Sequence, residues 1–216
     1  MNDTDFLHSR LILYDLLARL YTYPLDNATL DAISALHVEN APVALTDALA
    51  VMQAHIAAAE DRGALVDALN VEATRLFEGP GQPAVPPFAS FHLNERQLMG
   101  SAAHAVRRTY LAWNALPRDS GRVPPDHLAL ELGFMAYLAR GAMSANGNAR
   151  RWLAGSAEFL REHLLTWVPH FTAQVGTASA HPFFVGLANL MRAVVDTDAA
   201  WLEEIVNDSK DTEVIR

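Results

Sequence analysis

Cysteine is absent from the 216 residues of the chain, and this absence removes several kinds of functional site. Disulfide bonds, thiolate nucleophiles, iron–sulfur clusters and zinc sites built on cysteine are all excluded. A metal would therefore have to be held by histidine and carboxylate side chains alone. The absence of cysteine also agrees with a reducing compartment, so we expect a cytoplasmic protein.

Positively charged residues are also few. Lys and Arg together number 16, against 25 Asp and Glu, which leaves a net charge of -9. A nucleic-acid surface would have to be a local exception to this field, because phosphates are bound mainly through Lys and Arg. We therefore expect no nucleic acid as a partner, and a basic peptide is favoured instead.

Long apolar runs are missing as well. No segment approaches the roughly 18 uninterrupted apolar residues that suggest a membrane-spanning helix, so we expect no direct membrane insertion. The first residues include Asp3 and Asp5, whereas a secretory signal begins with basic residues. Hydrophobic residues make up 51% of the chain and charged residues 19%, which is ordinary for a folded protein.

The apolar residues recur with helical spacing along most of the chain, and the alternation that indicates strands is missing. Prolines and glycines separate the apolar segments. This pattern predicts helices at about residues 6–21, 26–36, 45–59, 64–77, 94–117, 127–142, 148–166 and 183–206. Asn94 and Gln97 have the spacing of a capping box, and Asp126 is suited to cap the next helix. Pro182 is suited to open the last helix, and Pro169 should kink or restart the one before it.

The prolines are concentrated in the middle of the chain, where seven of the eleven lie between Pro80 and Pro125. We therefore expect an all-α single domain of about eight to ten helices, in two sub-bundles joined by a Pro-rich loop. The N-terminal helical part covers about residues 1–78, the loop residues 79–93, and the C-terminal helical part about residues 94–207. A polar tail, residues 208–216, follows. The loop is the expected hinge or cleft.

The residues in and after this loop are suited to recognition. Residues 76–81 read Leu-Phe-Glu-Gly-Pro-Gly, residues 86–91 read Pro-Pro-Phe-Ala-Ser-Phe, and residues 125–127 read Pro-Asp-His. Glycine and proline fix backbone angles and so hold amides and aromatic rings in defined places. No nucleophile with its base, and no set of metal ligands, has evident spacing nearby. Binding a peptide is therefore favoured over catalysis.

Four segments resemble, in the same order, signatures of the TorD/DmsD/NarJ family of molybdoenzyme maturation chaperones. Residues 72–91 contain its LF-x-GP and PP-aromatic-x-S pattern, and residues 125–135 its PDH-x-x-x-EL-x-FM segment. Residues 163–171 resemble its HL-x-x-W-x-x-x-F helix, and residues 181–184 its HPF-aromatic helix start. The resemblance covers about residues 66–200 and is specific because the four segments occur together.

The resemblance implies a cytoplasmic, all-helical chaperone without a cofactor or catalytic residues of its own. Such a chaperone binds the twin-arginine signal peptide and the apo form of a molybdopterin-containing oxidoreductase. It assists cofactor insertion and prevents premature export. This chain departs from some members of the dimethyl-sulfoxide-reductase branch, because Ala73, Gly81 and Phe88 stand where those members have tryptophan. The identity of the client oxidoreductase is therefore open.

A receptor for a twin-arginine peptide needs an apolar groove with an acidic rim. We predict that residues 79–90 and the helix start at Asp126 and His127 form two walls of one groove. Asp126 would then face the arginines of the peptide. Apolar surface is expected from Phe77, Phe88 and Phe91, and negative charge from Glu72, Glu78, Asp126 and Glu131. The predicted peptide-binding residues are Phe77, Gly79, Pro80, Pro86, Pro87, Phe88, Ser90, Pro125, Asp126, His127 and Glu131.

Each of three predicted contact residues also has an ordinary structural interpretation. Asp126 could be only a helix cap, His127 a structural histidine, and Phe77 a core residue. Two other classes of function stay open at this point. His127 and Glu131 lie one turn apart and could begin the site of a metal-dependent hydrolase or oxidase, although the chain contains no E-x-x-H motif. The second class is a general helical adaptor. The oligomeric state, a monomer or a helix-swapped dimer, and the binding of a nucleotide or pterin also remain open.

Overall fold

Helices make up most of the chain in the computed structural model, which describes residues 3–38, 41–79, 81, 83–93, 98–118, 121–145 and 149–214. Within these ranges no strand is present, so the all-α prediction is confirmed. The elements are α1 (Asp3–Leu20), α2 (Asn27–Ala35), α3 (Val43–Ala57), α4 (Arg62–Ala73), η1 (Thr74–Glu78), α5 (Ala89–His92), α6 (Ser101–Ala112), α7 (Leu128–Ser144), α8 (Ala149–Phe159), η2 (Leu160–Leu164), α9 (Leu165–Ala178) and α10 (Pro182–Val214).

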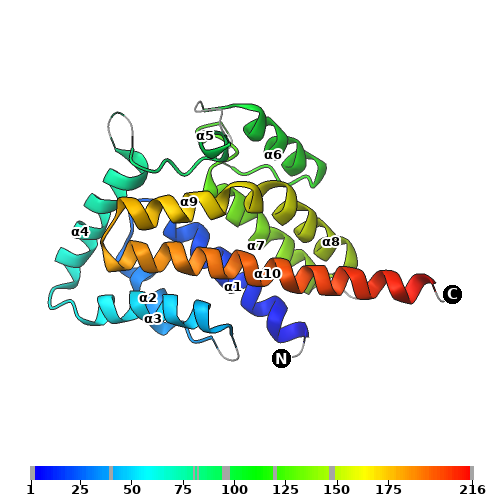
Figure 1. Ribbon diagram of the computed structural model, residues 1–216, viewed down its shortest axis with the longest axis horizontal. Coiled ribbons are helices and arrows are strands. Elements are labelled where there is room, and N and C mark those ends of the chain that lie inside the picture. The colour runs from blue at the N-terminus through cyan, green and yellow to red at the C-terminus, as the bar shows by residue number, and fades with distance from the viewer. Residues whose placement is uncertain are drawn as a thin grey trace.

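Helices from the two ends of the chain pack against each other. The contacts of α1 are mainly with α7, and those of α3 are mainly with α10. Figure 1 shows α10 running along the molecule beside α9, with α2 and α3 at one edge and α5 and α6 at the opposite edge. One cluster of buried residues extends through these contacts, from Tyr14 on α1 to Trp167 on α9. The halves on either side of the Pro-rich loop therefore share a core.

Local sequence signals account for several helix boundaries. The carboxylate of Asp26 accepts a 2.8 Å hydrogen bond from the Thr29 amide at the start of α2. Asp61 accepts from the Ala64 amide at 3.1 Å and caps α4 in the same way. Pro182 occupies the first position of α10, where its missing N–H removes no helical bond.

Several helices differ from the predicted ones, including α6, which covers only Ser101–Ala112 of the helix predicted at about residues 94–117. A short helix, α5, forms within the predicted loop, where Leu93 donates its amide to the Ala89 carbonyl. Helix α9 continues through Pro169 to Ala178, past the predicted end near residue 166. Helix α10 extends to Val214, past the predicted end near residue 206. The predicted capping box at Asn94 and Gln97 lies outside the described residues.

Two π-helical turns interrupt the regular helices. The first, η1, follows α4 and carries Leu76 and Phe77 of the Leu-Phe-Glu-Gly motif. The second, η2, joins α8 to α9, and at its end the Leu165 amide donates to the Leu160 carbonyl. Single π turns occur often at functional sites. In this chain, η1 leads directly into the predicted recognition loop. Among the described helices, none combines the length and the apolar character required to cross a membrane.

Candidate functional site

The Pro-rich loop and the start of α7 are held together by backbone hydrogen bonds. The Leu128 amide donates to the Pro87 carbonyl at 2.9 Å, and the Ala89 amide donates to the Asp126 carbonyl at 3.1 Å. Phe88 and His127 form an isolated antiparallel bridge between these bonds. We call residues 85–92 together with residues 124–128 the clasp. The structure thus brings together two motif segments that are separated in sequence, but they bond directly to each other, whereas the prediction made them two walls of one groove.

The predicted role of Asp126 at the surface is wrong for this structure. Its side chain is fully buried, at 0% exposure, so it does not face solvent. One carboxylate oxygen, Oδ2, accepts a 2.8 Å hydrogen bond from the Ser90 amide, and Oδ1 has no partner in the described structure. Asp126 is therefore the residue that ties α5 to the start of α7. This position could not be predicted, because it depends on where the Pro-rich loop packs.

His127, and not Asp126, is the N-cap of α7. Its backbone is extended, and its Nδ1 accepts a 3.1 Å hydrogen bond from the Ala129 amide. Burial lowers the pKa of His127 to about 4, so the ring is neutral at physiological pH and can act as this acceptor. The predicted cap at Asp126 is thus wrong by one residue. The Phe88 ring meets the His127 ring edge to face, with 5.0 Å between the ring centroids.

Glu131 lies beneath the clasp and cannot belong to an acidic rim. It is fully buried on α7, and the Trp167 indole Nε1 donates to its Oε2 at 3.2 Å. Burial raises the pKa of Glu131 well above its usual value, and the nearby Asp126 carboxylate raises it further. The neutral acid is therefore favoured. The hydroxyl of Tyr110 donates to the Pro125 carbonyl at 3.1 Å and closes the same buried region.

Phe77 is a core residue, so its predicted place on the peptide-binding surface is wrong. Its side chain is 2% exposed and stacks on Tyr23, with 5.6 Å between the ring centroids. Gly79 follows at the end of η1, where a Cβ atom would approach the Thr74 carbonyl oxygen to 3.0 Å. Gly81 has a φ of 98°, which L side chains rarely adopt, so a tryptophan at this position would be strained. Pro80 lies outside the described residues.

The clasp leaves aromatic surface only partly covered. Phe88, Phe91 and His127 are half-buried, whereas Pro86, Pro87, Ser90 and Pro125 are buried. Of the four predicted acidic residues, Glu78 is exposed and Glu72 is half-buried. The Glu72 carboxylate is already bound by Arg75, at 2.7 Å, and this hydrogen bond is the main cause of its lowered pKa. Negative charge at the surface therefore comes from fewer residues than predicted.

His92 is a member of this region that the sequence interpretation missed. Its Nε2 is 2.7 Å from the Pro86 carbonyl oxygen, and its ring stacks on Trp167 with 5.4 Å between centroids. Burial lowers the pKa of His92. The position of His92 directly after the Ala-Ser-Phe motif could have indicated that it belongs to this region. Within the described residues, no cluster of three or more His, Asp or Glu side chains is arranged to hold a metal ion.

Comparisons with known proteins identify one matching family and several similar proteins that are named as chaperones. The sequence model of a family described as the nitrate reductase delta subunit matches residues 38–173. "Chaperone protein TorD" of Vibrio cholerae is 29% identical over 136 residues, which are 62% of this chain and 62% of that protein. "Probable Tat proofreading chaperone DmsD" of Haemophilus influenzae is 33% identical over 116 residues, 53% of this chain and 52% of its own length.

Longer alignments have lower identity. The TorD chaperone of Aliivibrio salmonicida is 20% identical over 212 residues, and covers 94% of this chain and 99% of its own length. A solved structure, described as a redox enzyme maturation protein from Archaeoglobus fulgidus, covers 94% of this chain and 95% of its own at 22% identity. Its TM-score to this chain is 0.48.

Proposed function

The chain belongs to the nitrate reductase delta subunit family, and from this premise we propose that it is a chaperone for a molybdopterin-containing oxidoreductase. It binds the twin-arginine signal peptide and the apo form of that enzyme in the cytoplasm. It assists insertion of the cofactor and prevents premature export. The chain has no catalytic role of its own in this proposal.

The observation that carries the proposal is the clasp, because it unites the motif segments at residues 86–91 and 125–127. Backbone hydrogen bonds hold both segments before a peptide binds. A preformed surface loses less conformational freedom on binding than a flexible loop does. The two segments touch directly, so the peptide binds on their outer surface and not in a groove between them.

The half-buried rings of Phe88, Phe91 and His127 supply apolar contact for the hydrophobic part of the signal peptide. The exposed Glu78 supplies negative charge near the same loop. Asp126 and Glu131 are positioning residues in this proposal, since both are buried and hold the clasp from beneath. The overall charge of -9 attracts a peptide that carries two arginines.

Calorimetry with synthetic leader peptides tests this function. The peptides are the leaders of the molybdopterin oxidoreductases encoded in the same genome, each paired with a variant in which both arginines are alanine. We expect one leader to bind with micromolar affinity or better, about -8 kcal/mol. Its alanine variant should bind at least about tenfold more weakly, because hydrogen bonds to charged groups are lost.

Two outcomes would contradict the proposal. Equal binding of a leader and its alanine variant would indicate a general helical adaptor, which has no need of the arginines. Binding of no leader at all would remove the signal peptide as a ligand. A scrambled leader of the same composition serves as the control for nonspecific attraction to the acidic surface.

A further inference from the structure

A cavity of about 340 Å³ lies between α1, the start of α3 and α10. It is separate from the clasp, because α3 and α5 lie at opposite edges of the molecule (Figure 1). Its size is within the range of pockets that hold small ligands, about 300 to 1,000 Å³. The signal-peptide proposal makes no use of this cavity, so an inference about it goes beyond that function.

Most of the cavity wall is apolar. The apolar side chains are Phe6 and Leu13 on α1, Val38, Ala41 and Pro42 before α3, Leu45 on α3 and Val194 on α10. Leu45 and Val194 are each 3% exposed, whereas Val38 is half-buried and Pro42 is exposed, so the cavity is shielded from water at α3 and α10 and open beside the residues before α3. A ligand that fills the space would remove this apolar surface from water, which favours binding.

One end of the cavity is polar and fully buried. Arg10 donates to Asp198 through Nε at 2.5 Å and through Nη2 at 3.0 Å. The Tyr14 hydroxyl donates to the same carboxylate at 2.8 Å, and burial raises its pKa so that it stays protonated. Arg10 and Asp198 are 2% and 3% exposed, and their opposite charges are paired. The third guanidinium nitrogen, Nη1, has no acceptor within the described residues.

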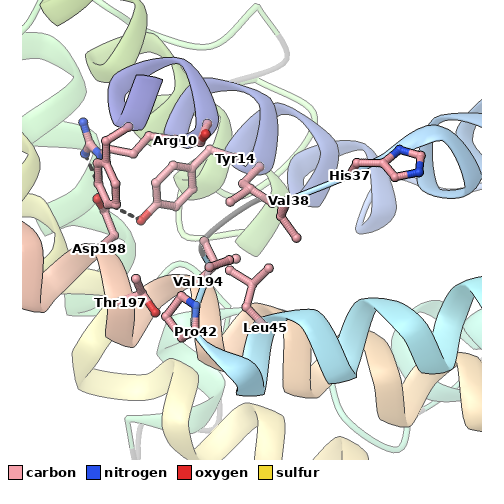
Figure 2. Close-up of a pocket in the computed structure, with 13 residues that line it drawn as sticks. Arg10, Tyr14, His37, Val38, Pro42, Leu45, Val194, Thr197 and Asp198 are labelled. Atoms are coloured by element: carbon pink, nitrogen blue, oxygen red, sulfur yellow. Dashed lines mark hydrogen bonds and ion pairs between the residues drawn. The ribbon is translucent and has the colours of Figure 1, made fainter. Parts of the chain in front are cut away.

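The close-up places these groups relative to one another. Figure 2 shows Arg10, Tyr14 and Asp198 together at one end and His37 on the far side, with Val38, Leu45 and Val194 between them. His37 is exposed, so the cavity opens at its side. Thr197 is half-buried on α10 and also lines the cavity, where its hydroxyl can donate a hydrogen bond.

We propose that this cavity binds a neutral, mainly apolar small molecule that carries a hydrogen-bond acceptor such as a ketone or an ester. The apolar walls enclose the body of the ligand, and the half-buried Thr197 hydroxyl donates to its acceptor, while the buried Arg10 and Asp198 pair closes the polar end. A charged ligand is disfavoured because both charges at the polar end are already paired, and another buried ion would have no counterion. The net charge of -9 acts further against an anion.

Fluorescence titration of the full chain with prodan, a neutral naphthyl ketone dye, tests the proposal. We expect saturable binding at a single site, with emission shifted to the blue in the apolar cavity. A prodan analogue with an alkyl group in place of the ketone should bind about fivefold more weakly, the effect of one lost hydrogen bond. The anionic dye anilinonaphthalene sulfonate should bind more weakly than prodan. Equal affinity for the ketone and the alkyl analogue would overturn the proposal.

Variants that fill the cavity locate the binding site. Val38→Trp and Thr197→Trp each place an indole in the lining and should weaken prodan binding at least about tenfold. Val43→Trp is the matched control, because Val43 is 72% exposed on α3 and does not line the cavity. Thermal unfolding shows whether each variant is folded. Thr197→Val changes little volume, and it should remove the preference for the ketone even if the tryptophan variants fail to fold.

Two further outcomes would overturn the proposal. One is unchanged prodan binding to folded Val38→Trp and Thr197→Trp. The other is the absence of saturable binding to the wild-type chain. An excess of the signal peptide should not displace prodan, since the clasp lies elsewhere. Failure of the peptide experiment and failure of this one are therefore distinguishable.

Discussion

Two regions of this molecule bury carboxylates, and they differ in what surrounds the acid. Asp198 on α10 is held by the Arg10 guanidinium and the Tyr14 hydroxyl (Figure 2). Asp126 and Glu131 are held by the Ser90 amide and the Trp167 indole, and the second carboxylate oxygen of each has no hydrogen-bond partner in the described residues. The first region joins the two ends of the chain, whereas the second shapes a candidate binding surface.

The difference teaches how the two regions respond to perturbation. A buried ion pair contributes little net stability, but removal of one partner leaves an uncompensated charge and is costly. Burial without a cation raises the pKa of Glu131 and favours its neutral form, so the stability of this region responds to pH instead. We therefore expect substitutions to change the free energy of unfolding most at the Arg10 and Asp198 pair. Changes of pH should alter it mainly at the clasp.

The largest effect is expected from breaking the ion pair. Arg10→Met leaves the Asp198 carboxylate buried without its partner and should lower the free energy of unfolding by about 3 to 5 kcal/mol, measured by urea titration. The exposed pair of Arg62 with Asp31 is the control, and Arg62→Met should cost at most about 1 kcal/mol. Arg10→Met combined with Asp198→Leu should recover most of the loss. Equal costs at the two sites would contradict the comparison.

The next effect is acid sensitivity of the clasp. Burial lowers the pKa of His127 to about 4 from 6.5, so the unfolded state takes up a proton first as the pH falls. The His127 contribution to the free energy of unfolding should therefore decrease between about pH 6.5 and about pH 4, by about 2 to 3 kcal/mol. His127→Asn keeps a capping side chain and should flatten this part of the profile. His37→Asn, at an exposed histidine, is the control and should leave the pH dependence of the free energy of unfolding unchanged. Identical pH profiles for the two variants would refute the prediction.

A smaller effect is expected on peptide binding. Phe88→Ala removes a half-buried ring from the clasp surface and should weaken binding of the cognate leader about tenfold, as measured by calorimetry. Val71→Ala, at a residue 72% exposed on α4, is the matched control and should leave the affinity unchanged. Unchanged affinity in Phe88→Ala, with the leader still dependent on its arginines, would place the peptide on another surface.

The smallest effect at neutral pH is expected from Glu131→Gln. The amide is close in shape to a protonated carboxyl group, and its oxygen can still accept from Trp167, so any loss should be at most about 1 kcal/mol. The amide also needs no proton, which favours the variant at neutral pH. The raised pKa of Glu131 means that the folded state holds a proton that the unfolded state releases. The wild-type chain should therefore lose stability as the pH rises toward that pKa, and Glu131→Gln should not.

Asp198→Asn is the matching substitution in the other region, because it is the same change from acid to amide. It removes the charge that faces Arg10 and should cost about 3 kcal/mol or more at neutral pH. Urea unfolding at about pH 6 and about pH 9 compares the two variants. Similar losses in both would show that Glu131 is charged in the folded state.

Helix positions were predictable where local signals agreed. The apolar spacing and the prolines placed most helices, and the acidic caps at Asp26 and Asp61 act as local sequence rules require. Pro169 does not end or restart a helix, because it lies inside α9, which continues to Ala178 directly after the π turn η2. The short helix α5 was missed, since four residues carry too little periodicity to be recognised.

The sequence predicted which two segments of the candidate site come together, but not which of their side chains reach the surface. The motifs indicated that Phe88 and His127 belong together, and the backbone bridge joins them. Which side chains reach solvent depends on neighbours that are remote in sequence. Asp126 is covered by α5 and Glu131 by Trp167. Phe77 is covered by Tyr21, which follows α1, and by Phe171 on α9 and Phe184 on α10.

The sequence by itself determined the helical class, the absence of thiol chemistry, the acidic charge and the motifs that mark the family. These properties depend on composition and on spacing within single segments. Only the tertiary structure decided which charges are buried and what balances them. Arg10 and Asp198 are 188 residues apart, and Ser90 and Asp126 are 36 apart, so no local pattern indicates either contact. The cavity beside Arg10 also depends on contacts between distant segments, because it is the space left where α1, α3 and α10 pack together.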